Sequence, residues 1–400
     1  MKRQFDIVIV GAGMVGLTLA NLLAQSERHD ALNILLIDAG KKPAFAADSD
    51  VSLRVSAIAS GSTELLARIG VWDDIVNTRA CPYRNMRVWD APGNVEGPET
   101  LCFDAAEFAV PQLGFIVENV LIQGALLKHL ESSAVTVRFE TPITSLNKVG
   151  DRYEVELAGG ELLASDLLIG ADGAASFVRT SAAIGITAWQ YSQTAFVTHL
   201  QPEKSHRNTA WQRFLKTGPI GLLPLIDGRV STVWSTTAAQ AAAALDASDE
   251  QLQVMLTNAT DNVLGKLTPS GPRGSFPLKA QHADQYVLPG LALVGDAAHA
   301  VHPLAGQGAN LGLADAETLV SVITAALAAN ENPGDLPTLR KYERARKGAN
   351  QTMLHFIDGL NRLFSNDSTS LARLRGTGMR LFNRSGPIRE RAVQVALGIR

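Results

Sequence analysis

The chain has little cysteine and no long uninterrupted apolar run. Its 400 residues include two cysteines, Cys81 and Cys102, which are far apart and have no CxxC spacing. We therefore expect two reduced thiols rather than a disulfide or a metal site. No window reaches the roughly 18 consecutive apolar residues of a membrane span. The apolar residues 5–10 precede a glycine-rich turn, not a signal-peptide cleavage site, so we expect a soluble or peripheral protein.

A strong excess of charge is also missing. The formal net charge is -3, and charged residues make up 19% of the chain against 46% hydrophobic residues. This balance gives no electrostatic basis for a nucleic-acid partner. The lack of long polar tracts excludes a largely disordered chain. The length and apolar content are sufficient for two or three domains.

The first 40 residues have the pattern strand, turn, helix, strand. A β-rich run at 6–10 precedes the turn at 11–16, an apolar helix is expected over 15–24, and a second strand over 33–37. This order predicts a βαβ unit with parallel strands and a right-handed crossover.

The turn at 11–16 reads Gly-Ala-Gly-Met-Val-Gly, a GxGxxG motif. Glycines allow the tight turn, the approach of the backbone to a pyrophosphate and the packing of helix on strand, and the helix N-terminus offers free N–H groups. The motif alone is weak evidence, but Asp38 follows at about the 20-residue spacing of a ribose-binding acid. Because Asp38 disfavours a 2′-phosphate, the pattern predicts FAD or NAD rather than NADP.

Two later segments repeat the pattern of a buried strand that ends at an acid. Residues 167–170 precede Asp172, and residues 291–294 precede Asp296. A loop rich in glycine then leads into a long helix, whose N-terminus favours an anionic group such as a reduced flavin. His299 and His302 in this loop fit hydrogen-bonded residues better than metal ligands, because no carboxylate or thiolate lies at ligand spacing.

Further elements follow from periodicity. We expect helices over 119–130 and 238–244 and mainly helix after 309, and strands over 135–140, 153–157, 220–225 and 230–235. The segment from 185 to 275 has an antiparallel texture. We therefore expect the dinucleotide-binding fold to be interrupted by a second domain and then resumed.

In this order and spacing, the three motifs resemble the group A flavoprotein monooxygenases, relatives of para-hydroxybenzoate hydroxylase. Within that group, further segments are similar to the ubiquinone-biosynthesis hydroxylases, namely 54–58, 69–72, 117–119, 211–214, 218–220 with 223–225, 302–308 and 342–347. The resemblance covers nearly the whole chain. The combination of these segments is specific to the family, although no single segment is.

The resemblance implies a non-covalent FAD site. The cofactor-binding residues that it implies are Gly11, Gly13 and Gly16 at the pyrophosphate, Asp38 at the adenosine ribose, Arg54 near the phosphates, Asp296 at the ribityl chain, and further Met14, Val15, Asp172, Gly173, Gly295, Ala309 and Asn310. The residues placed along the isoalloxazine ring are Pro303, Gly306, Gln307 and Gly308. No general base is assigned. Ala309 stands where a larger apolar residue is expected, which would widen the pocket slightly.

The implied reaction is hydroxylation of the aromatic or quinol ring of a polyprenylated ubiquinone precursor by O₂, through a flavin C4a-hydroperoxide in a dry pocket. Segments 103–107, 117–119 and 188–191 favour the demethoxy-quinol step, and the polyprenylphenol step stays an alternative. No second GxGxxG unit is present for NAD(P)H, so NAD(P)H would dock transiently or a partner protein would supply electrons.

Proteins of other classes share this fold. A reductase or an epoxidase on the same fold stays open. A halogenase is disfavoured, because the chain has no Trp-x-Trp-x-Ile-Pro segment. A non-enzymatic binding protein with a dinucleotide fold would have no need for Asp296 and the 306–308 loop.

The expected fold is α/β. A discontinuous Rossmann-like FAD-binding domain is expected from 1–75, 105–180 and 275–330, interrupted by a mixed or antiparallel-sheet substrate domain from 76–104 and 181–274. A helical C-terminal region is expected from 331–400.

The last 30 residues are basic. Residues 371–400 hold seven arginines, one acid (Glu390) and no lysine, a side-chain charge of +6, mixed with apolar residues at helical spacing. One interpretation is docking on an anionic membrane, or on an acidic partner in a ubiquinone-biosynthesis complex. The other is a helical face that pairs with acids of the same chain. The first predicts a cytoplasmic protein that is peripheral at the inner membrane face.

Overall fold

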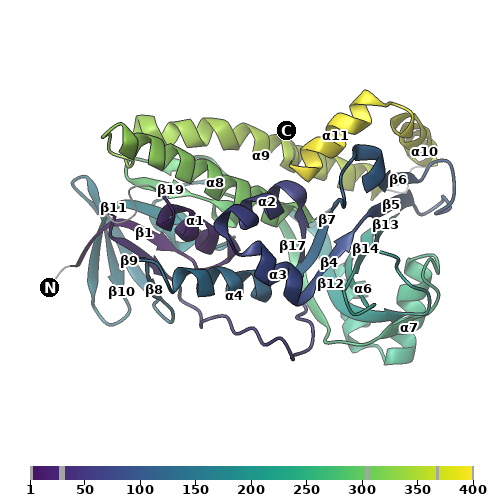
Figure 1. Ribbon diagram of the computed structural model, residues 1–400. Helices are drawn as coiled ribbons and strands as arrows, with labels where there is room; N and C mark the ends of the chain where they lie inside the picture. The colour runs from purple at the N-terminus through teal and green to yellow at the C-terminus, as the bar shows by residue number, and fades with distance from the viewer. Residues whose placement is uncertain (1–2, 27–31, 303–305, 366–368, 399–400) are drawn as a thin grey trace.

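A computed structural model describes residues 3–26, 32–302, 306–365 and 369–398. The described chain forms two large sheets, a small third sheet and helices that cover them (Figure 1). The elements are β1 (Arg3–Val10), α1 (Met14–Ala24), β2 (Ile34–Ile37), β3 (Val55–Ala59), α2 (Ser60–Ile69), α3 (Trp72–Arg79), β4 (Ala80–Tyr83), β5 (Asn85–Asp90), β6 (Leu101–Asp104), η2 (Ala105–Phe108), β7 (Gly114–Glu118), α4 (Asn119–Leu130), β8 (Thr136–Arg138), β9 (Ile143–Val149), β10 (Arg152–Leu157), β11 (Leu162–Gly170), α5 (Phe177–Ser181), β12 (Ile186–Pro202), β13 (Thr209–Leu215), β14 (Gly218–Pro224), β15 (Val230–Thr236), α6 (Ala238–Asp246), α7 (Asp249–Ala259), β16 (Leu267–Pro269), β17 (Gly274–Ala283), β18 (Val287–Leu288), β19 (Leu291–Leu293), η3 (Gly295–Ala297), β20 (His299–Ala300), α8 (Gln307–Ala328), α9 (Leu336–Phe364), α10 (Thr369–Asn383) and α11 (Pro387–Leu397).

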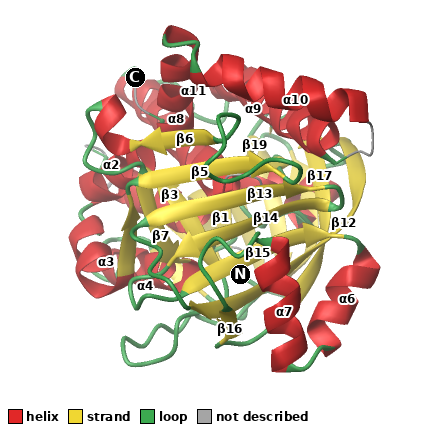
Figure 2. Cartoon of the chain, turned by 90° about the vertical axis from the view of Figure 1, so that its right-hand side faces the viewer, coloured by secondary structure: helices red, strands yellow, loops and turns green. Residues whose placement is uncertain are grey.

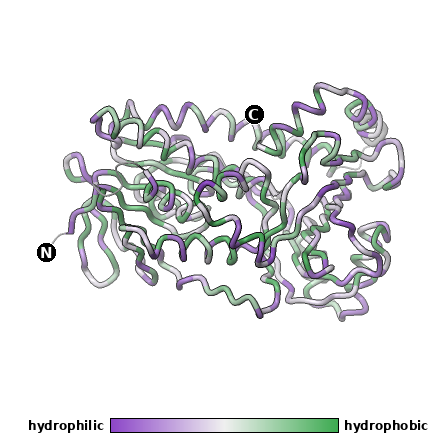
Figure 3. The backbone as a smooth tube through the Cα atoms, viewed as in Figure 1, coloured by the Kyte–Doolittle hydropathy of each residue, from purple (hydrophilic) through white to green (hydrophobic). Residues whose placement is uncertain are grey.

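The first sheet carries the dinucleotide-binding pattern. Its strand order is β18-β19-β11-β1-β2-β8, and β1 pairs in parallel with both β2 and β11. The four residues of β2, Ile-Leu-Leu-Ile, are all buried, as expected for a parallel strand covered on both faces. The hydrophobic colour of these strands is visible in Figure 3. Because the strands are parallel, their carboxyl ends meet at one edge, where the three motifs lie.

The second large sheet has nine strands, in the order β20-β17-β12-β15-β14-β13-β5-β6, with β16 beside β12. Its pairings are antiparallel except for the parallel pair β5–β13. One face packs on α6 and α7 around Phe196, Ile220 and Trp234 (Figure 2). Side chains alternate along a strand, so Gly221 and Val233 point to the opposite face.

The small third sheet has the order β3-β7-β4, and Arg54 immediately precedes β3. Helix α8 runs along the first sheet and packs between α1 and α9. It is long and apolar enough to cross a membrane by length and composition, but 44% of its most apolar window is buried inside the protein.

The predicted elements are confirmed. The strands expected near 6–10, 33–37, 135–140, 153–157, 167–170, 220–225, 230–235 and 291–294 are β1, β2, β8, β10, β11, β14, β15 and β19. The helices expected at 15–24, 119–130, 238–244 and after 309 are α1, α4, α6 and the run from α8 to α11. The α/β fold class with a helical C-terminal part is therefore confirmed. The domain boundaries stay a prediction; β17, within 275–330, pairs with β12 of the nine-stranded sheet.

Candidate cofactor and substrate site

The glycines of the first motif meet distinct steric demands. Gly11 has φ +107°, and a Cβ there would lie 2.3 Å from the carbonyl oxygen of Ala171. A Cβ on Gly16 would lie 1.9 Å from the Gly11 oxygen. Gly13, by contrast, faces open space immediately before α1 begins at Met14. Gly11 and Gly16 therefore permit close packing, and Gly13 leaves room at a helix N-terminus for an anionic group.

Asp38 lies at the end of β2 and holds the glycine turn. Its Oδ2 accepts a hydrogen bond from the Ala12 amide at 2.6 Å, and its Oδ1 accepts one from the Gly40 amide at 2.6 Å. Each carboxylate oxygen has a further lone pair, and Asp38 lines the cavity described next. It can therefore accept hydrogen bonds from a ligand hydroxyl without releasing the turn.

A large cavity of about 980 Å³ opens at the carboxyl ends of the first sheet. It extends from the first motif to the open face of the nine-stranded sheet. The predicted site residues that line it are Gly11, Gly13, Met14, Val15, Asp38, Arg54, Asp172, Gly173, Asp296, Gly306, Gly308 and Ala309. The predicted residues that do not line it are Gly16, Gly295, Gln307 and Asn310. Pro303 lies outside the described residues.

Asp296 presents an unused carboxylate to the cavity. Its side chain is accessible from the cavity, while protein surrounds it on its other sides. Burial raises the pKa of Asp296, and the nearby His299 and Arg54 oppose that rise. No described residue donates a hydrogen bond to this carboxylate. Its free acceptors fit a ligand that carries several hydroxyl groups, such as the ribityl chain of a flavin.

Asp172 lines the cavity and also forms hydrogen bonds within its own segment. Its Oδ1 accepts from the Ser176 hydroxyl at 2.5 Å and its Oδ2 from the Val178 amide at 3.0 Å, so it holds the start of α5. Buried Arg179 on that helix donates to the carbonyl oxygens of Ala174 at 2.9 Å and Ala297 at 2.8 Å. The second motif is thereby tied to the third.

The N-terminus of α8 docks on β3. Gly306 has φ +63°, and a Cβ there would lie 2.8 Å from the Cβ of Ala57. The Asn310 side chain donates to the Ala57 oxygen at 3.0 Å and accepts from the Ala59 amide at 2.9 Å. The amide group of Asn310 is thus bonded to the protein, and its role at a cofactor would be to hold the N-terminus of α8 in place.

Helix α8 also carries the centre of a buried polar network that the sequence did not reveal. Fully buried Asp315 accepts hydrogen bonds from His299 Nε2 at 2.5 Å, Arg346 Nε at 2.7 Å, Asn350 Nδ2 at 3.0 Å and the Gly295 amide at 3.2 Å. Burial alone would raise the pKa of Asp315, but His299 and Arg346 hold it below its usual value. The network joins α8 and α9 to the segment that carries Asp296. His299 is hydrogen-bonded, as the sequence predicted.

His302, the second histidine of the loop, belongs to another buried group. Its Nε2 donates to the Gln193 side-chain oxygen at 3.2 Å, and its ring meets Tyr191 edge-on at 4.9 Å between centroids. Burial lowers the pKa of His302 to about 4. It is therefore neutral at pH 7, and it fits the predicted role of a hydrogen-bonded loop residue.

Helix α9 is anchored by the segment 342–347. The Tyr342 hydroxyl donates to the Leu293 oxygen at 2.8 Å, and Glu343 accepts from the Tyr286 amide at 2.8 Å. Leu293 ends β19, two residues before Gly295. The family-like segment therefore fixes α9 against the strand that delivers Asp296, and it does not line the cavity.

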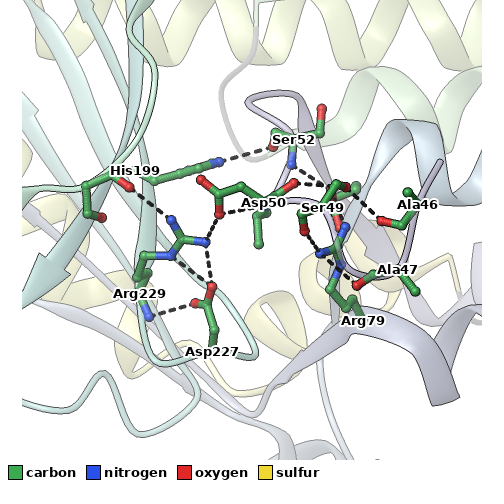
Figure 4. A network of polar contacts seen from close by, with 12 residues as sticks. Ala46, Ala47, Ser49, Asp50, Ser52, Arg79, His199, Asp227 and Arg229 are labelled. Carbon is green, nitrogen blue, oxygen red and sulfur yellow. Dashed lines mark hydrogen bonds and ion pairs between the residues drawn. The ribbon is translucent and has the colours of Figure 1, made fainter. Parts of the chain in front are cut away.

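The loop of residues 39–54, which leads from β2 to Arg54, is tied to the nine-stranded sheet (Figure 4). Arg229 bridges Asp50 at 2.5 Å and Asp227 at 2.7 Å. Its hydrogen bond to Asp50 lowers the pKa of that carboxyl. His199 Nε2 donates to the Ser52 oxygen at 3.1 Å. These contacts hold the loop across one side of the cavity.

The open face of the nine-stranded sheet forms the floor of the cavity. Its lining side chains are mostly apolar and include Val197, Leu223 and Val233. Gly221 leaves a gap among them, because a Cβ there would meet nothing closer than 3.8 Å. Gly218 on the same strand has φ +135° and no room for a Cβ, whereas Gly221 has no positive φ. Neither backbone geometry nor protein packing explains the glycine at 221, but space for a ligand would.

Three features together define the fold of FAD-dependent monooxygenases. They are a βαβ glycine turn, two strands that end in an acid and meet the turn at one cavity, and an antiparallel sheet that forms the floor of that cavity. Solved structures share it. p-Nitrophenol 4-monooxygenase PnpA from Pseudomonas putida DLL-E4 has a TM-score of 0.80 at 18% identity and full coverage of both chains. Klebsiella pneumoniae HpxO complexed with FAD and uric acid has a TM-score of 0.75 at 18% identity, covering 98% of this chain and 96% of that one.

Sequence comparison is more specific. The FAD binding domain family model matches residues 4–356. The 3-demethoxyubiquinol 3-hydroxylase of Escherichia coli (strain K12) is 40% identical over 100% of both chains. Ubiquinone hydroxylase UbiL of Rhodospirillum rubrum is 37% identical over 98% of this chain and 89% of that protein. The human mitochondrial ubiquinone biosynthesis monooxygenase COQ6 is 35% identical over 98% and 92%. The chain belongs to the FAD-binding family of ubiquinone-biosynthesis hydroxylases, and it is an FAD-dependent aromatic-ring hydroxylase.

Proposed function

We propose that the chain hydroxylates the ring of a polyprenylated demethoxy-quinol, a precursor of ubiquinone. The observation that carries this proposal is the single cavity that joins the dinucleotide motifs to an apolar sheet floor. Its volume of about 980 Å³ is large for one small ligand and suits a cofactor beside a substrate ring. The name of the Escherichia coli relative favours the demethoxy-quinol step, and the polyprenylphenol step is the alternative.

The predicted residues would hold FAD as follows. The open space at Gly13 and the N-terminus of α1 receive the pyrophosphate, and Asp38 accepts from the adenosine ribose. The unused carboxylate of Asp296 accepts from the ribityl hydroxyls, and Arg54 lies near the phosphates. Gly306 and Gly308 shape the wall at the N-terminus of α8. Reduced FAD supplies the activation of dioxygen, and the protein supplies binding, orientation and a dry pocket.

The floor of the cavity excludes water from the reacting ring. Val197, Leu223 and Val233 present aliphatic side chains, and Met86 and Ile116 continue the apolar wall. An apolar lining favours a prenylated ring, because burying its alkyl surface is favourable by about 25 cal/mol per Å². The same lining slows the loss of activated oxygen as hydrogen peroxide.

Substrate-stimulated oxygen uptake tests the proposal. FAD-loaded protein, with NADH, NADPH or light-reduced flavin as the electron source, should consume oxygen faster with a prenylated demethoxy-quinol than without it, in step with a product 16 mass units heavier. A higher rate with the polyprenylphenol would select the alternative step. Reduction of either substrate without oxygen uptake would mean a reductase.

Some of the C-terminal arginines fit the interpretation in which they pair with acids of the same chain, and others fit membrane docking. Three of them pair with acids of the same chain: Arg375 with Asp90 at 2.7 Å, Arg380 with Glu99 at 3.2 Å and Arg389 with Glu107 at 2.7 Å. Buried Arg375 also lies over the Phe364 ring, so it fixes α10 on β5. These three arginines hold the helices in place, as the second interpretation predicts.

Exposed apolar residues of α10 and α11 support docking on an anionic membrane, which we propose as the way the enzyme meets its lipid-borne substrate. Leu381, Ile388 and Val395 are exposed by 65%, 68% and 53%. Arg384 and Arg391 are exposed beside them. Apolar residues flanked by basic ones suit an interfacial surface, and each basic residue near an anionic surface contributes about 1 kcal/mol.

Co-sedimentation with liposomes tests this surface. A variant with Leu381, Ile388 and Val395 all changed to serine should bind vesicles of anionic phospholipid less than the wild type at low salt. The control changes Ile226 and Val254, exposed by 55% and 60% on other elements, to serine. Equal binding of all three proteins would remove the membrane proposal and leave the hydroxylase assignment intact.

A further inference from the structure

An unpartnered hydroxyl lies in the floor of the cavity. Ser231 on β15 is fully buried, and its Oγ has no hydrogen-bond partner within the described chain. The residue lines the cavity. A buried hydroxyl without a partner costs about 1–3 kcal/mol. This cost is removed if a ligand in the cavity offers the hydroxyl a polar atom.

A second unpartnered atom lies beside it on the neighbouring strand. His199 on β12 is the direct cross-strand partner of Ser231 and is fully buried. Directly opposed residues have their Cβ atoms about 4.5–5.5 Å apart on the same face. His199 Nε2 donates to the Ser52 oxygen at 3.1 Å, so the proton of the neutral ring is on Nε2. The lone pair of Nδ1 is buried and has no partner among the described residues.

The groups around His199 act on its charged form in both directions, and burial disfavours that form most. Asp50 and Asp227 both favour the charged ring, while Arg229, which lies between these two acids, opposes it. Burial is the largest influence and lowers the pKa of His199, so the ring is neutral and able to accept a proton near pH 7. Figure 4 shows how Ser52, Asp50 and the Arg229–Asp227 pair surround the ring.

Room for a ring exists next to this pair. Gly221 is the cross-strand partner of Val233, two residues from Ser231 on the same face of β15. A Cβ at Gly221 would lie 3.8 Å from its nearest neighbour, the Trp211 oxygen, so space is open above this residue. A flat ring over Gly221 would bring a ring substituent towards the Ser231 hydroxyl.

We propose that Ser231 and His199 form a proton-accepting pair that binds a ring hydroxyl of the substrate. This inference rests on the proposed function and assigns the general base for it. The substrate hydroxyl donates to Ser231 Oγ, and the Ser231 hydroxyl turns its own proton to His199 Nδ1. The substrate O–H bond breaks and an N–H bond forms at Nδ1, while Nε2 keeps its bond to Ser52. The resulting oxyanion makes the ring more electron-rich, and the proton returns by the same route to the product oxygen.

Two substitutions separate this role from a structural one. Ser231→Ala removes the hydroxyl. His199→Gln keeps an amide donor that can reach the Ser52 oxygen but removes the basic nitrogen. Both variants should fold and bind FAD as the wild type does. Each should lower kcat/KM for the prenylated quinol by about a hundredfold at pH 7. Ser275→Ala, an exposed serine on β17, is the matched control and should keep the wild-type value.

The pH profile is the decisive readout. In the wild type kcat/KM should rise with pH as His199 loses its proton, and this limb should vanish in His199→Gln. The deficit of both variants should shrink towards pH 10, where a phenolic hydroxyl ionises by itself, at a pKa of about 10. If the wild type turns over and both variants have its kcat/KM and its pH profile, the inference is overturned.

A probe that needs no turnover separates the two proposals. A prenylated nitrophenol absorbs visible light only as its phenolate. The wild type should lower the pKa of the bound probe relative to free probe, and Ser231→Ala and His199→Gln should abolish that shift. A shift in the wild type without hydroxylation of any quinol or phenol would sustain the pair and sink the proposed function. No difference in the probe between wild type and variants would overturn the pair.

Discussion

At the scale of single residues, the site combines residues of one βαβ unit, such as Asp38, with residues that only the fold brings together, such as Ser231 and His199. The glycine turn and Asp38 could be found because both belong to one βαβ unit with a fixed spacing. Ser231 and His199 could not, because an unpartnered atom is visible only once the partners of every neighbouring strand are known. Asp315 was missed for the same reason, since its partner Arg346 lies 31 residues further on.

Asp296 gives the first residue-scale prediction. Asp296→Ala should lower FAD affinity by tenfold or more, because a hydrogen bond to a charged group contributes about 1.5–3 kcal/mol. The fold should stay intact, since no described residue depends on that carboxylate for a hydrogen bond. Flavin absorbance per protein after gel filtration measures the loss, with Asp151→Ala in an exposed turn as the control. Full FAD occupancy of the variant would show that the ribityl chain lies elsewhere.

Gly221 gives the second residue-scale prediction. Gly221→Leu should fill the space above the sheet floor and raise the KM for the prenylated quinol, while FAD content stays unchanged. The fold should tolerate it, because the strand geometry at this position is open to any residue. Gly348→Leu on the exposed side of α9 is the matched control. An unaltered KM would mean that the substrate does not pass over Gly221.

At the scale of elements, the sequence predicted single strands and helices well because each carries its own periodicity. It did not predict the three-stranded sheet of β3, β7 and β4, whose pairings join residues far apart in the chain, such as Val55 and Glu118. Segment 342–347 is recognisable by its resemblance to the family. Its structural role, which is to anchor α9 on β19, is evident only from its contacts.

The anchoring of α9 can be tested through Arg346. Arg346→Met leaves fully buried Asp315 with one charged partner fewer, so the free energy of unfolding should fall by about 3–5 kcal/mol. Arg344→Met, two residues away on the exposed side of the same helix, should change it little. Chemical denaturation measures both. Equal stability of the two variants would show that the buried network does not hold α8 and α9 together.

At the scale of the whole molecule, buried neutral histidines make stability depend on pH. Burial lowers the pKa of both His282 and His302 to about 4, whereas an unfolded histidine titrates near 6.5. Between these values the unfolded chain binds more protons than the folded one. Stability should therefore fall as the pH is lowered from about 6.5 to about 4.

The urea midpoint measured at pH 7.5, 6 and 5 checks this dependence. His302→Gln keeps an amide donor towards Gln193 and removes one titrating group, so its midpoint should fall less steeply over the same range than that of the wild type. Identical slopes in the two proteins would show that His302 titrates alike in the folded and unfolded chain.

The central claim is that this molecule transfers one oxygen atom from dioxygen to the ring of a prenylated quinol. The most direct measurement is the mass of the product formed under ¹⁸O₂ by the FAD-loaded enzyme with the prenylated demethoxy-quinol. We expect a hydroxylated product 2 mass units heavier than the product formed under ordinary oxygen. A product of unchanged mass, with its new oxygen drawn from water, or reduced flavin that yields only hydrogen peroxide in the presence of both candidate substrates, would contradict it.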